Sequence, residues 1–304
     1  MLNSEPLVSI HFPTYNHEIF LESALLSAIN QTYKNIEICI SDDASTDKSV
    51  HIIREYKEKY PDKIKFVHQR INLGMAKNLN ACLEMCSGEY ICFLSGEDLF
   101  HRNKIELQLQ EFLKSSDLSL LGHFIEVIDE SSEKIGQMNK VYKPNKGPRE
   151  WIKKGPLFGA VSIMLRKEVI PKRGFDERIP VLNDQKFWID CLHQDKGYGQ
   201  LELYLSKYRK TKKGATNDWL KAGSGYPELY SLIESDYPEY RKECKKGINF
   251  NFTYGKGMAY RKKSKFLTSS KFFLISFFRD PTLLKGIIRI FENVLIYGRS
   301  IWKN

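Results

Sequence analysis

The chain has 304 residues, of which 42% are hydrophobic, and its formal net charge at pH 7 is +10. This length and composition exclude a disordered protein and allow one large α/β domain with an appendage. The charge is unevenly distributed, because residues 250–304 hold 11 Lys and Arg against 2 Asp and Glu, which leaves +1 for the first 249 residues. The basic character therefore belongs to the C-terminal part and not to the whole fold.

The six cysteines include no CxxC pair, and Cys39 and Cys92 lie in predicted strands. This pattern indicates small core residues in a reducing compartment rather than zinc ligands or disulfides. The first residues show no basic segment followed by a long apolar run, and no window reaches about 18 apolar residues without a charge. We therefore expect a protein that is made and kept in the cytoplasm.

Apolar runs alternate with segments of helical periodicity in the first third of the chain. The runs cover residues 7–12, 36–40, 64–68 and 90–94, and a three- to four-residue apolar repeat follows each of the first three. Strands that alternate with helices in this way predict a doubly wound sheet with parallel strands and right-handed crossovers.

Two acidic pairs follow strands of this predicted sheet, Asp42 and Asp43 after the second strand and Glu97 and Asp98 after the fourth. Because parallel strands end at the same edge, we expect both pairs where open α/β sheets bind ligands. Carboxylates there suit Mg²⁺ or Mn²⁺ held jointly with substrate phosphates. A solvated turn or a helix N-cap is the alternative for Glu97 and Asp98. The chain has no GxGxxG and no P-loop, which argues against a dinucleotide cofactor.

Several motifs occur in a fixed order along the chain. They are Pro13-Thr14-Tyr15-Asn16, Ser41-Asp42-Asp43-Ala44-Ser45-Thr46-Asp47, Asn72-Leu73-Gly74, Gly88-Glu89-Tyr90, Gly96-Glu97-Asp98, Gly174-Phe175-Asp176-Glu177, Asn183-Asp184 and Tyr208-Arg209. In this order they resemble the family-2 glycosyltransferases with the GT-A fold, over residues 6–216. The resemblance implies an α/β fold with a GT-A (Rossmann-like) mixed sheet flanked by helices and a C-terminal helical extension. We expect a catalytic domain at 1–217, with a nucleotide-binding half at 1–128 and an acceptor half at 129–217, and a basic, aromatic-rich extension at 218–304.

The resemblance also implies an activity. Members of this family are inverting enzymes that move a sugar from a nucleotide-sugar donor to an acceptor hydroxyl. We expect a UDP-sugar as donor and a lipid-linked or envelope glycan as acceptor, with Mn²⁺ or Mg²⁺ as cofactor. Two rival functions stay open, namely an inactive glycan- or nucleotide-binding module of the same fold and a nucleotidyltransferase. The chain lacks the Gly-rich basic loop that a nucleotidyltransferase needs after the first strand.

Carried over position by position, the resemblance assigns Asp43 to the uracil or ribose, Asp98 and Glu97 to the metal, and Asp184 to the base that deprotonates the acceptor. The other donor-binding positions that it implies are Pro13, Tyr15, Asp42, Asn72, Gly74, Lys77, Asn78 and Arg209.

The chain also departs from the usual family pattern. Ser95 and Glu97 stand where aspartates are usual, Lys77 where Arg is common, Asn183 where Glu is usual before the base, and Thr211 where many relatives have His. The alternatives are a solvated helix residue for Lys77, a helix N-cap for Asp184 and a basic surface loop for Arg209.

The end of the chain predicts an amphipathic helix. One face holds Leu284, Ile287, Ile288, Phe291, Val294, Leu295 and Ile301 or Trp302, and the other holds Lys285, Arg289, Glu292, Arg299 and Lys303. An apolar stripe opposite basic residues is typical of a helix in a membrane interface, so we expect an anionic membrane surface as partner and a location on the inner face of the cell membrane. Packing on the catalytic domain and a homo-oligomer contact are the alternatives. No nucleic-acid motif accompanies the basic residues.

Overall fold

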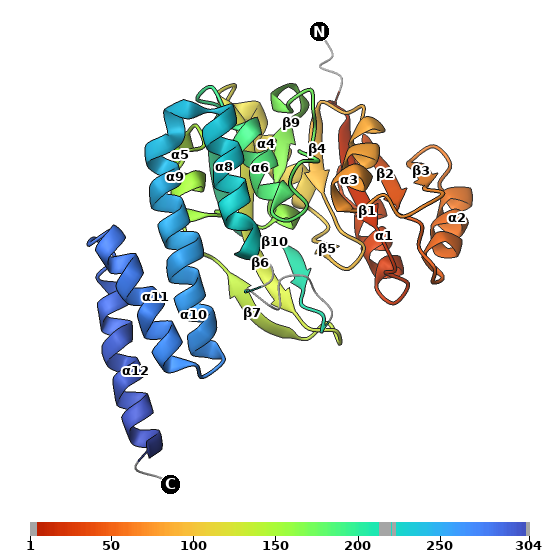
Figure 1. Ribbon diagram of the computed structural model, residues 1–304. Coiled ribbons are helices and arrows are strands. Elements are labelled where there is room, and N and C mark those ends of the chain that lie inside the picture. The colour runs from red at the N-terminus through yellow and green to blue at the C-terminus, as the bar shows by residue number, and fades with distance from the viewer. Residues whose placement is uncertain (1–4, 213–219, 221–222, 302–304) are drawn as a thin grey trace. The chain divides into compact units, whose positions relative to one another are not determined.

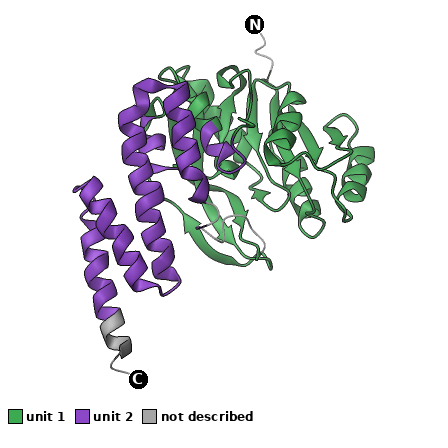
Figure 2. Ribbon diagram, in the orientation of Figure 1, with its two compact units in different colours: residues 1–148, 157–178, 187–212 green, residues 149–156, 179–186, 213–304 purple. Residues whose placement is uncertain are grey.

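The computed structural model describes residues 5–212, 220 and 223–301 (Figure 1). Backbone contacts divide the chain into two compact units (Figure 2). Unit 1 comprises residues 1–148, 157–178 and 187–212, and unit 2 comprises residues 149–156, 179–186 and 213–304. A catalytic domain that ends at residue 217 stays a prediction.

Unit 1 is built on a mixed ten-stranded sheet with the strand order β3-β2-β1-β4-β9-β6-β10-β5, in which β7 also pairs with β6 and β8 with β10. The first four strands are parallel to one another, as the sequence predicts, and β9 pairs antiparallel with both β4 and β6. The strands are β1 (Val8–Thr14), β2 (Ile36–Asp42), β3 (Ile64–His68), β4 (Tyr90–Phe93), β5 (Leu99–Phe100), β6 (Leu118–Ile128), β7 (Lys134–Met138), β8 (Asn145–Lys146), β9 (Met164–Arg166) and β10 (Gly197–Arg209).

The apolar runs become strands because helices cover them. Every residue of β2 is buried, as expected for a parallel strand with both faces packed. The helices of unit 1 are α1 (Leu21–Ile29), α2 (Ser49–Lys59), α3 (Met75–Glu84) and α4 (Lys104–Lys114). Helix α1 buries Leu21, Ala24, Leu25, Ala28 and Ile29, which lie at the three- to four-residue spacing of one helix face.

The topology brings three loops together. Strand β1 lies between β2 and β4, and Thr14 at the end of β1 is opposite Asp42 at the end of β2. The loops after β1, β2 and β4 therefore leave the same edge of the sheet, and this edge carries the motifs that the sequence singles out.

Unit 2 is helical in its described part. Its helices are α5 (Arg149–Lys154), α8 (Tyr226–Asp236), α9 (Arg241–Gly247), the π-helical segment η5 (Ile248–Tyr254), α10 (Gly255–Lys262), α11 (Phe266–Arg279) and α12 (Lys285–Ile301), and α6 (Asn183–Cys191) begins in unit 2 and ends in unit 1. The Tyr230 hydroxyl donates a 2.8 Å hydrogen bond to the Ile152 carbonyl, which ties α8 to α5. Gly247 lies against both residues, where a Cβ atom would come within 2.5 Å of the Tyr230 hydroxyl.

In the described part of the chain, we find no helix with the length and apolar character needed to cross a membrane.

Candidate functional site

The loops after β1 and β2 are fastened to each other by hydrogen bonds. The Asn16 backbone amide donates to Ser45 Oγ at 2.8 Å, and the Thr46 amide donates to Asn16 Oδ1 at 2.8 Å. Asn16 has a φ of 55°, a left-handed conformation that Asn adopts more readily than most residues. The two loops therefore form one braced surface at the edge of the sheet.

Asp42 and Asp43 are adjacent in sequence but have different surroundings. Asp42 is fully buried, and its Oδ1 accepts a 2.9 Å hydrogen bond from the Ser45 amide and lies 2.8 Å from His68 Nδ1. It thus supports its own loop. Its predicted contact with the donor stays a prediction.

Asp43 holds the segment that leads into α3. Its two carboxylate oxygens accept hydrogen bonds from the backbone amides of Leu73 at 2.7 Å and Gly74 at 3.1 Å, and Asn72 Nδ2 donates to its carbonyl at 3.2 Å. Gly74 has a φ of +85°, which explains glycine at this position. An ionised carboxylate has about four acceptor positions, so Asp43 retains capacity for a ligand N–H or O–H group.

The remaining residues of this side divide into supports and exposed side chains. Asn78 is buried and exchanges hydrogen bonds with Ser41, which fastens α3 to β2. Lys77, which precedes Asn78 in α3, is exposed, Tyr15 is 44% exposed, and Pro13 is half-buried. The exposed side chains are the ones that a ligand can reach.

The acidic pair after β4 is also divided between a support and a more accessible group. Asp98 is 5% exposed, and its oxygens accept hydrogen bonds from the Arg209 backbone amide at 2.8 Å and from Ser95 Oγ at 3.0 Å. Burial raises the pKa of Asp98 to about 7, although both hydrogen bonds oppose the shift. Glu97 is half-buried, with Oε2 3.4 Å from the Thr211 hydroxyl, and burial raises its pKa as well.

This donor set fits a divalent cation. Burial raises the pKa of both neighbouring carboxyl groups and the charge of Arg209 offsets this only in part, so a bound cation would favour their ionised forms. Within the described residues, no group of three or more His, Cys, Asp and Glu side chains is placed to hold a metal. A cation at Glu97 and Asp98 would therefore complete its shell with phosphate and water oxygens, as Mg²⁺ commonly does.

Arg209 braces this part of the edge from inside. The side chain is 2% exposed, donates from Nε to the Glu97 carbonyl at 3.0 Å and from Nη1 to the Asp129 carbonyl at 2.8 Å, and stacks 4.5 Å from the centre of the Phe20 ring. The alternative of a basic surface loop is therefore wrong for this residue. A direct contact between Arg209 and donor phosphates stays a prediction.

Asp184 lies in the first turn of α6, in unit 2. Its Oδ1 accepts a 2.8 Å hydrogen bond from the amide of the adjacent Gln185, whereas an N-cap side chain accepts from an amide two or three residues further on. Burial raises the pKa of Asp184, and burial together with the charge of Asp184 raises the pKa of Tyr226 to about 12. A carboxylate that is desolvated in this way is suited to accept a proton, and its role as the base stays a prediction.

Sequence reasoning misses two contacts that hold the site together. His17 Nδ1 lies 3.0 Å from Thr14 Oγ1, and its ring lies so close to Gly96 that a Cβ there would come within 2.8 Å of the ring. This contact joins the loop after β1 to the acidic loop after β4. The Asp129 carbonyl that receives Arg209 has no signal in the sequence, because any residue supplies a backbone carbonyl.

The second half of the family pattern also packs in unit 1. The Phe175 amide donates to Asn80 Oδ1 at 2.7 Å, and Asn80 Nδ2 donates back to the Phe175 carbonyl at 2.9 Å. Gly174 has a φ of +64° at this close approach to α3. The segment at 174–177 therefore fixes the outer side of α3, the helix that begins at Gly74.

These features define a GT-A-type glycosyltransferase fold, a mixed sheet flanked by helices with acidic loops at the carboxyl edge of its parallel half. The family model described as glycosyl transferase family 2 matches residues 9–173, more than half of the chain. The chain belongs to this family.

Relatives and solved structures agree with this assignment. An uncharacterized glycosyltransferase of Methanocaldococcus jannaschii is 31% identical over 211 residues, which covers 67% of this chain and 71% of the relative. TuaG of Bacillus subtilis, whose name links it to teichuronic acid biosynthesis, is 27% identical over 237 residues, or 77% of this chain and 91% of the relative.

The crystal structure of S. aureus TarS residues 1–349 with UDP has a TM-score of 0.64 at 14% identity and covers 97% of this chain and 91% of that chain. The mannosyltransferase PcManGT of Pyrobaculum calidifontis, in complex with GDP-Man and Mn²⁺, has a TM-score of 0.63 at 15% identity, over 99% of this chain and 82% of that chain. At these identities the likeness concerns the fold.

Proposed function

We propose that this glycosyltransferase transfers a sugar from a nucleotide-sugar, with UDP as the nucleotide, to a hydroxyl of a glycan or lipid-linked glycan during polysaccharide synthesis, with inversion at the sugar carbon. The observation that carries the proposal is the pairing of two carboxylate loops at one sheet edge. Asp43, in the loop after β2, leaves acceptor capacity, and the Glu97–Asp98 pair follows β4, the strand on the other side of β1.

The names of similar proteins support the choice of donor and pathway. TarS structures contain UDP and UDP-GlcNAc, and PcManGT contains GDP-Man and Mn²⁺. TuaG is named for teichuronic acid biosynthesis, and chondroitin synthase of Escherichia coli is 39% identical over 119 residues, or 39% of this chain and 17% of the relative. The names of TuaG and chondroitin synthase refer to the synthesis of polysaccharides, which supports a glycan acceptor.

In this proposal Asp43 accepts a hydrogen bond from the uracil or ribose and orients the nucleotide. Glu97 and Asp98 would hold Mn²⁺ or Mg²⁺. When bound, such an ion neutralises the charge that develops on the leaving nucleoside diphosphate. Arg209 and Ser95 keep Asp98 in place, because both donate hydrogen bonds to its carboxylate.

Asp184 is the proposed base. It takes the proton from the acceptor hydroxyl while the hydroxyl oxygen bonds to the sugar carbon on the face opposite the departing diphosphate. A direct displacement of this kind inverts the configuration. The raised pKa of Asp184 brings the carboxylate closer to the range in which a general base is effective at neutral pH.

A donor screen tests the proposal. The full chain is incubated with UDP-, GDP- and dTDP-sugars, with Mn²⁺ or with EDTA, and the released nucleoside diphosphate is measured. We expect release from a UDP-sugar in Mn²⁺ and a large reduction in EDTA. In a parallel assay with UTP and a sugar 1-phosphate, release of pyrophosphate would point to a nucleotidyltransferase. A complete lack of turnover across donors and glycan acceptors, with UDP still bound, would point to an inactive binding module.

A further inference from the structure

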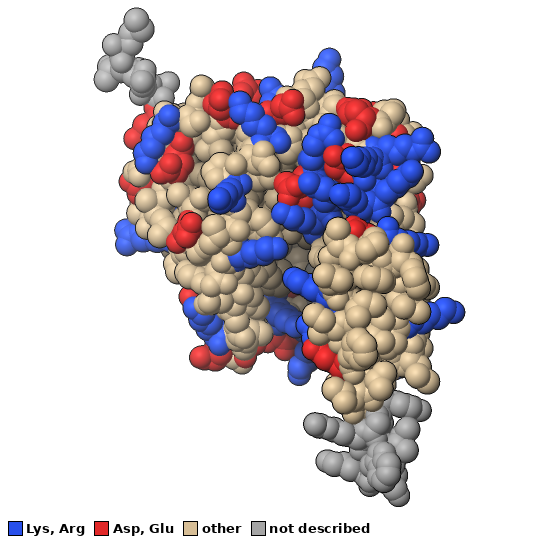
Figure 3. Space-filling model, turned by 90° about the vertical axis from the view of Figure 1, so that its left-hand side faces the viewer, with Lys and Arg blue, Asp and Glu red and all other residues tan. Residues whose placement is uncertain are grey.

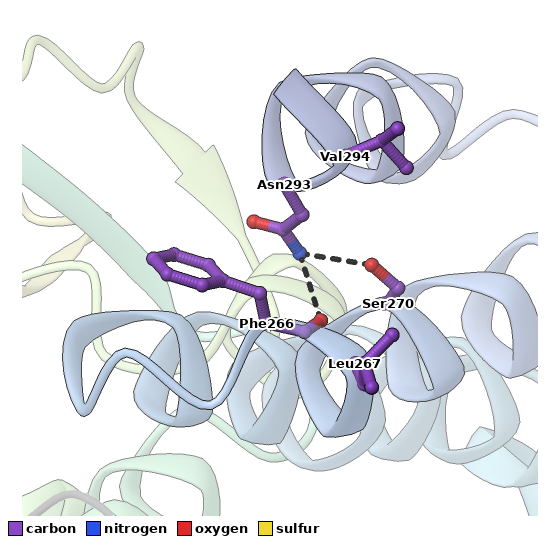
Figure 4. A pocket seen from close by; sticks show the side chains of 5 residues that line it. All are labelled: Phe266, Leu267, Ser270, Asn293 and Val294. Atoms are coloured by element: carbon purple, nitrogen blue, oxygen red, sulfur yellow. Dashed lines mark hydrogen bonds between the residues drawn. The ribbon is translucent and has the colours of Figure 1, made fainter. Parts of the chain in front are cut away.

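The C-terminal helices α11 and α12 pack against each other through polar and small residues. Asn293 of α12 is 1% exposed, and its Nδ2 donates to Ser269 Oγ at 3.1 Å, to Ser270 Oγ at 3.0 Å and to the Phe266 carbonyl at 3.3 Å. Figure 4 shows the Asn293 side chain reaching from α12 towards α11, where it helps to line a pocket with Leu267 and Val294. The Asn293 amide thus links the two helices at three points of α11.

The contact between α10 and α11 has the same character. The fully buried Ser269 donates from Oγ to the Gly257 carbonyl at 2.7 Å. A Cβ at Gly257 would come within 2.5 Å of the Phe273 ring, and a Cβ at Gly286 of α12 would come within 3.2 Å of the Phe273 carbonyl. Small residues therefore let both neighbouring helices approach α11 closely.

Large apolar side chains lie on the outside of the same helices. Six of them are between 57% and 74% exposed, namely Leu267, Phe278, Ile288, Phe291, Val294 and Leu295, and we call these six residues the outer face. Figure 3 shows the surface next to the grey C-terminal residues as a broad area almost without charged side chains. An exposed apolar surface of this kind in a soluble protein marks an interaction site.

The arrangement is the reverse of a helix pair that folds in water. There the apolar stripe faces the neighbouring helix and polar residues face the solvent. In lipid, apolar side chains gain nothing by turning inward, so helix contacts consist of Gly, Ser and Asn while the apolar side chains face outward. The outer face and the small and polar residues buried between α10, α11 and α12 follow the second pattern, although Phe273 is also fully buried there.

The charges beside the outer face favour a negatively charged surface. Residues 261–296 hold 8 Lys and Arg against 2 Asp and Glu. One of the two acids, Glu292, is already paired with Arg261 at 2.6 Å and Arg289 at 2.8 Å. Lys262, Lys265 and Lys271 are exposed near or within α11. Basic residues next to an apolar helix face are attracted by anionic lipid headgroups.

We propose that the outer face binds an anionic lipid bilayer, with α11 and α12 lying in the membrane interface and the lysines in contact with the headgroups. The structure extends the expectation from the sequence, because α11 contributes to the surface together with α12. Such a surface would hold the enzyme next to a lipid-linked acceptor, and it does not depend on which sugar the enzyme transfers.

Vesicle flotation of the full chain tests the proposal. Vesicles contain phosphatidylcholine alone or phosphatidylcholine and phosphatidylglycerol in a two-to-one ratio. We expect binding to the anionic vesicles at low salt, a loss of about tenfold or more in Ile288→Asn/Leu295→Asn, and a loss of about fivefold per charge in Lys262→Gln/Lys265→Gln/Lys271→Gln.

Matched control variants come from unit 1. Leu113 is 65% exposed on α4, and Lys143, Lys172 and Lys196 are exposed lysines, so Leu113→Asn and the triple Lys→Gln variant at these positions should bind vesicles like the unchanged protein. All six native cysteines are buried. A fluorophore on Leu295→Cys should therefore report selectively and shift to the blue on anionic vesicles, whereas one on Leu113→Cys should not.

Two kinds of result would overturn the proposal. One concerns vesicles: either the full chain does not bind anionic vesicles at low salt, or the outer-face variants leave its binding unchanged. The other is a dimer in light scattering that Ile288→Asn/Leu295→Asn converts to a monomer without any vesicle binding, because the outer face would then be covered by a second copy of the chain. Circular dichroism of each variant confirms that it is folded.

Discussion

Buried polar side chains occur in two regions, at the carboxyl edge of the sheet in unit 1 and in the α11–α12 contact of unit 2. The apolar side chains near them are buried in the first region and exposed in the second. At the sheet edge, Asp43 and Asp98 cover a core whose apolar residues, such as Phe12 and Ile40, are fully buried. In the α11–α12 contact, Asn293 is inside and Phe291 is 67% exposed. A buried polar group therefore does not identify a ligand site by itself. Whether the apolar side chains near it are buried or exposed shows which surface has a partner.

The largest effect is expected at Asp184, where a substitution should reduce sugar transfer without weakening donor binding at the sheet edge. Asp184→Asn removes the proposed base and should lower kcat by about 10²–10⁴-fold. The affinity for UDP should stay within about twofold, because a base acts in the transition state. Single-turnover kinetics and calorimetry measure the two quantities. Asp184→Ser keeps a side chain that can cap a helix but removes the carboxylate. Near-normal transfer by this variant would mean that Asp184 caps the helix and is not the base.

Two phenylalanines of α11 test the inverted arrangement of unit 2. Phe273 is fully buried and Phe278 is 74% exposed. Phe273→Ala should lower the free energy of unfolding by about 3–5 kcal/mol. Phe278→Ala should change it by less than about 0.5 kcal/mol. Urea denaturation of the full chain measures both values. An equally large cost for Phe278→Ala would mean that this side chain is covered in solution, and the comparison between the two regions would fail.

Asp98→Asn tests the proposed cation site at the sheet edge. The isosteric amide can still accept the hydrogen bond from the Arg209 backbone amide, so the fold should stay intact. Mn²⁺ should increase the affinity of the unchanged protein for UDP. Loss of even an outer-shell partner of a metal costs about 10–100-fold in affinity, so this increase should fall by at least that factor in Asp98→Asn. Titrations of UDP with Mn²⁺ and with EDTA measure this gain.

Ser132→Ala is the control for Asp98→Asn, because Ser132 contacts Arg209 from the other side. An unchanged Mn²⁺-dependent gain in Asp98→Asn would assign the cation to Glu97 without Asp98.

The smallest effect concerns Glu37, a buried carboxylate at the opposite end of β2. Burial alone would raise its pKa, but hydrogen bonds from Lys65, Ser9 and Ser87 prevail and lower it from 4.5 to about 2. Because the folded pKa lies below the unfolded one, the stabilisation is complete above about pH 4.5 and is lost as the pH falls towards 2. Glu37→Gln should therefore cost about 1–3 kcal/mol at pH 7.

Below pH 4.5 the difference between Glu37→Gln and the unchanged protein should shrink. Unfolding in urea at pH 7 and pH 3 measures it. Glu58→Gln on the exposed side of α2 is the matched control. A difference that does not depend on pH would show that the hydrogen-bond geometry, and not the charge, stabilises this turn.

Local pattern determines much of unit 1. The run at 64–68 becomes a strand with the predicted bounds, and the four predicted strands form the parallel half of the sheet. Continuous apolar runs indicate strands that are buried on both faces, and three- to four-residue repeats show which side of a helix is apolar, so both can be read without knowing the neighbours. The motif order at 13–98 likewise indicates the family, because each motif follows a strand that the same pattern predicts.

Tertiary structure decides the contacts between distant residues. Asp98 receives the backbone amide of Arg209 from 111 positions away, and Asp43 holds the amides of Leu73 and Gly74. The sequence also predicts an apolar stripe on α12 but not that Asn293 points into the helix contact while the stripe faces outward. A one-dimensional pattern records which residues share a face, and only the packing of the folded chain decides what that face meets.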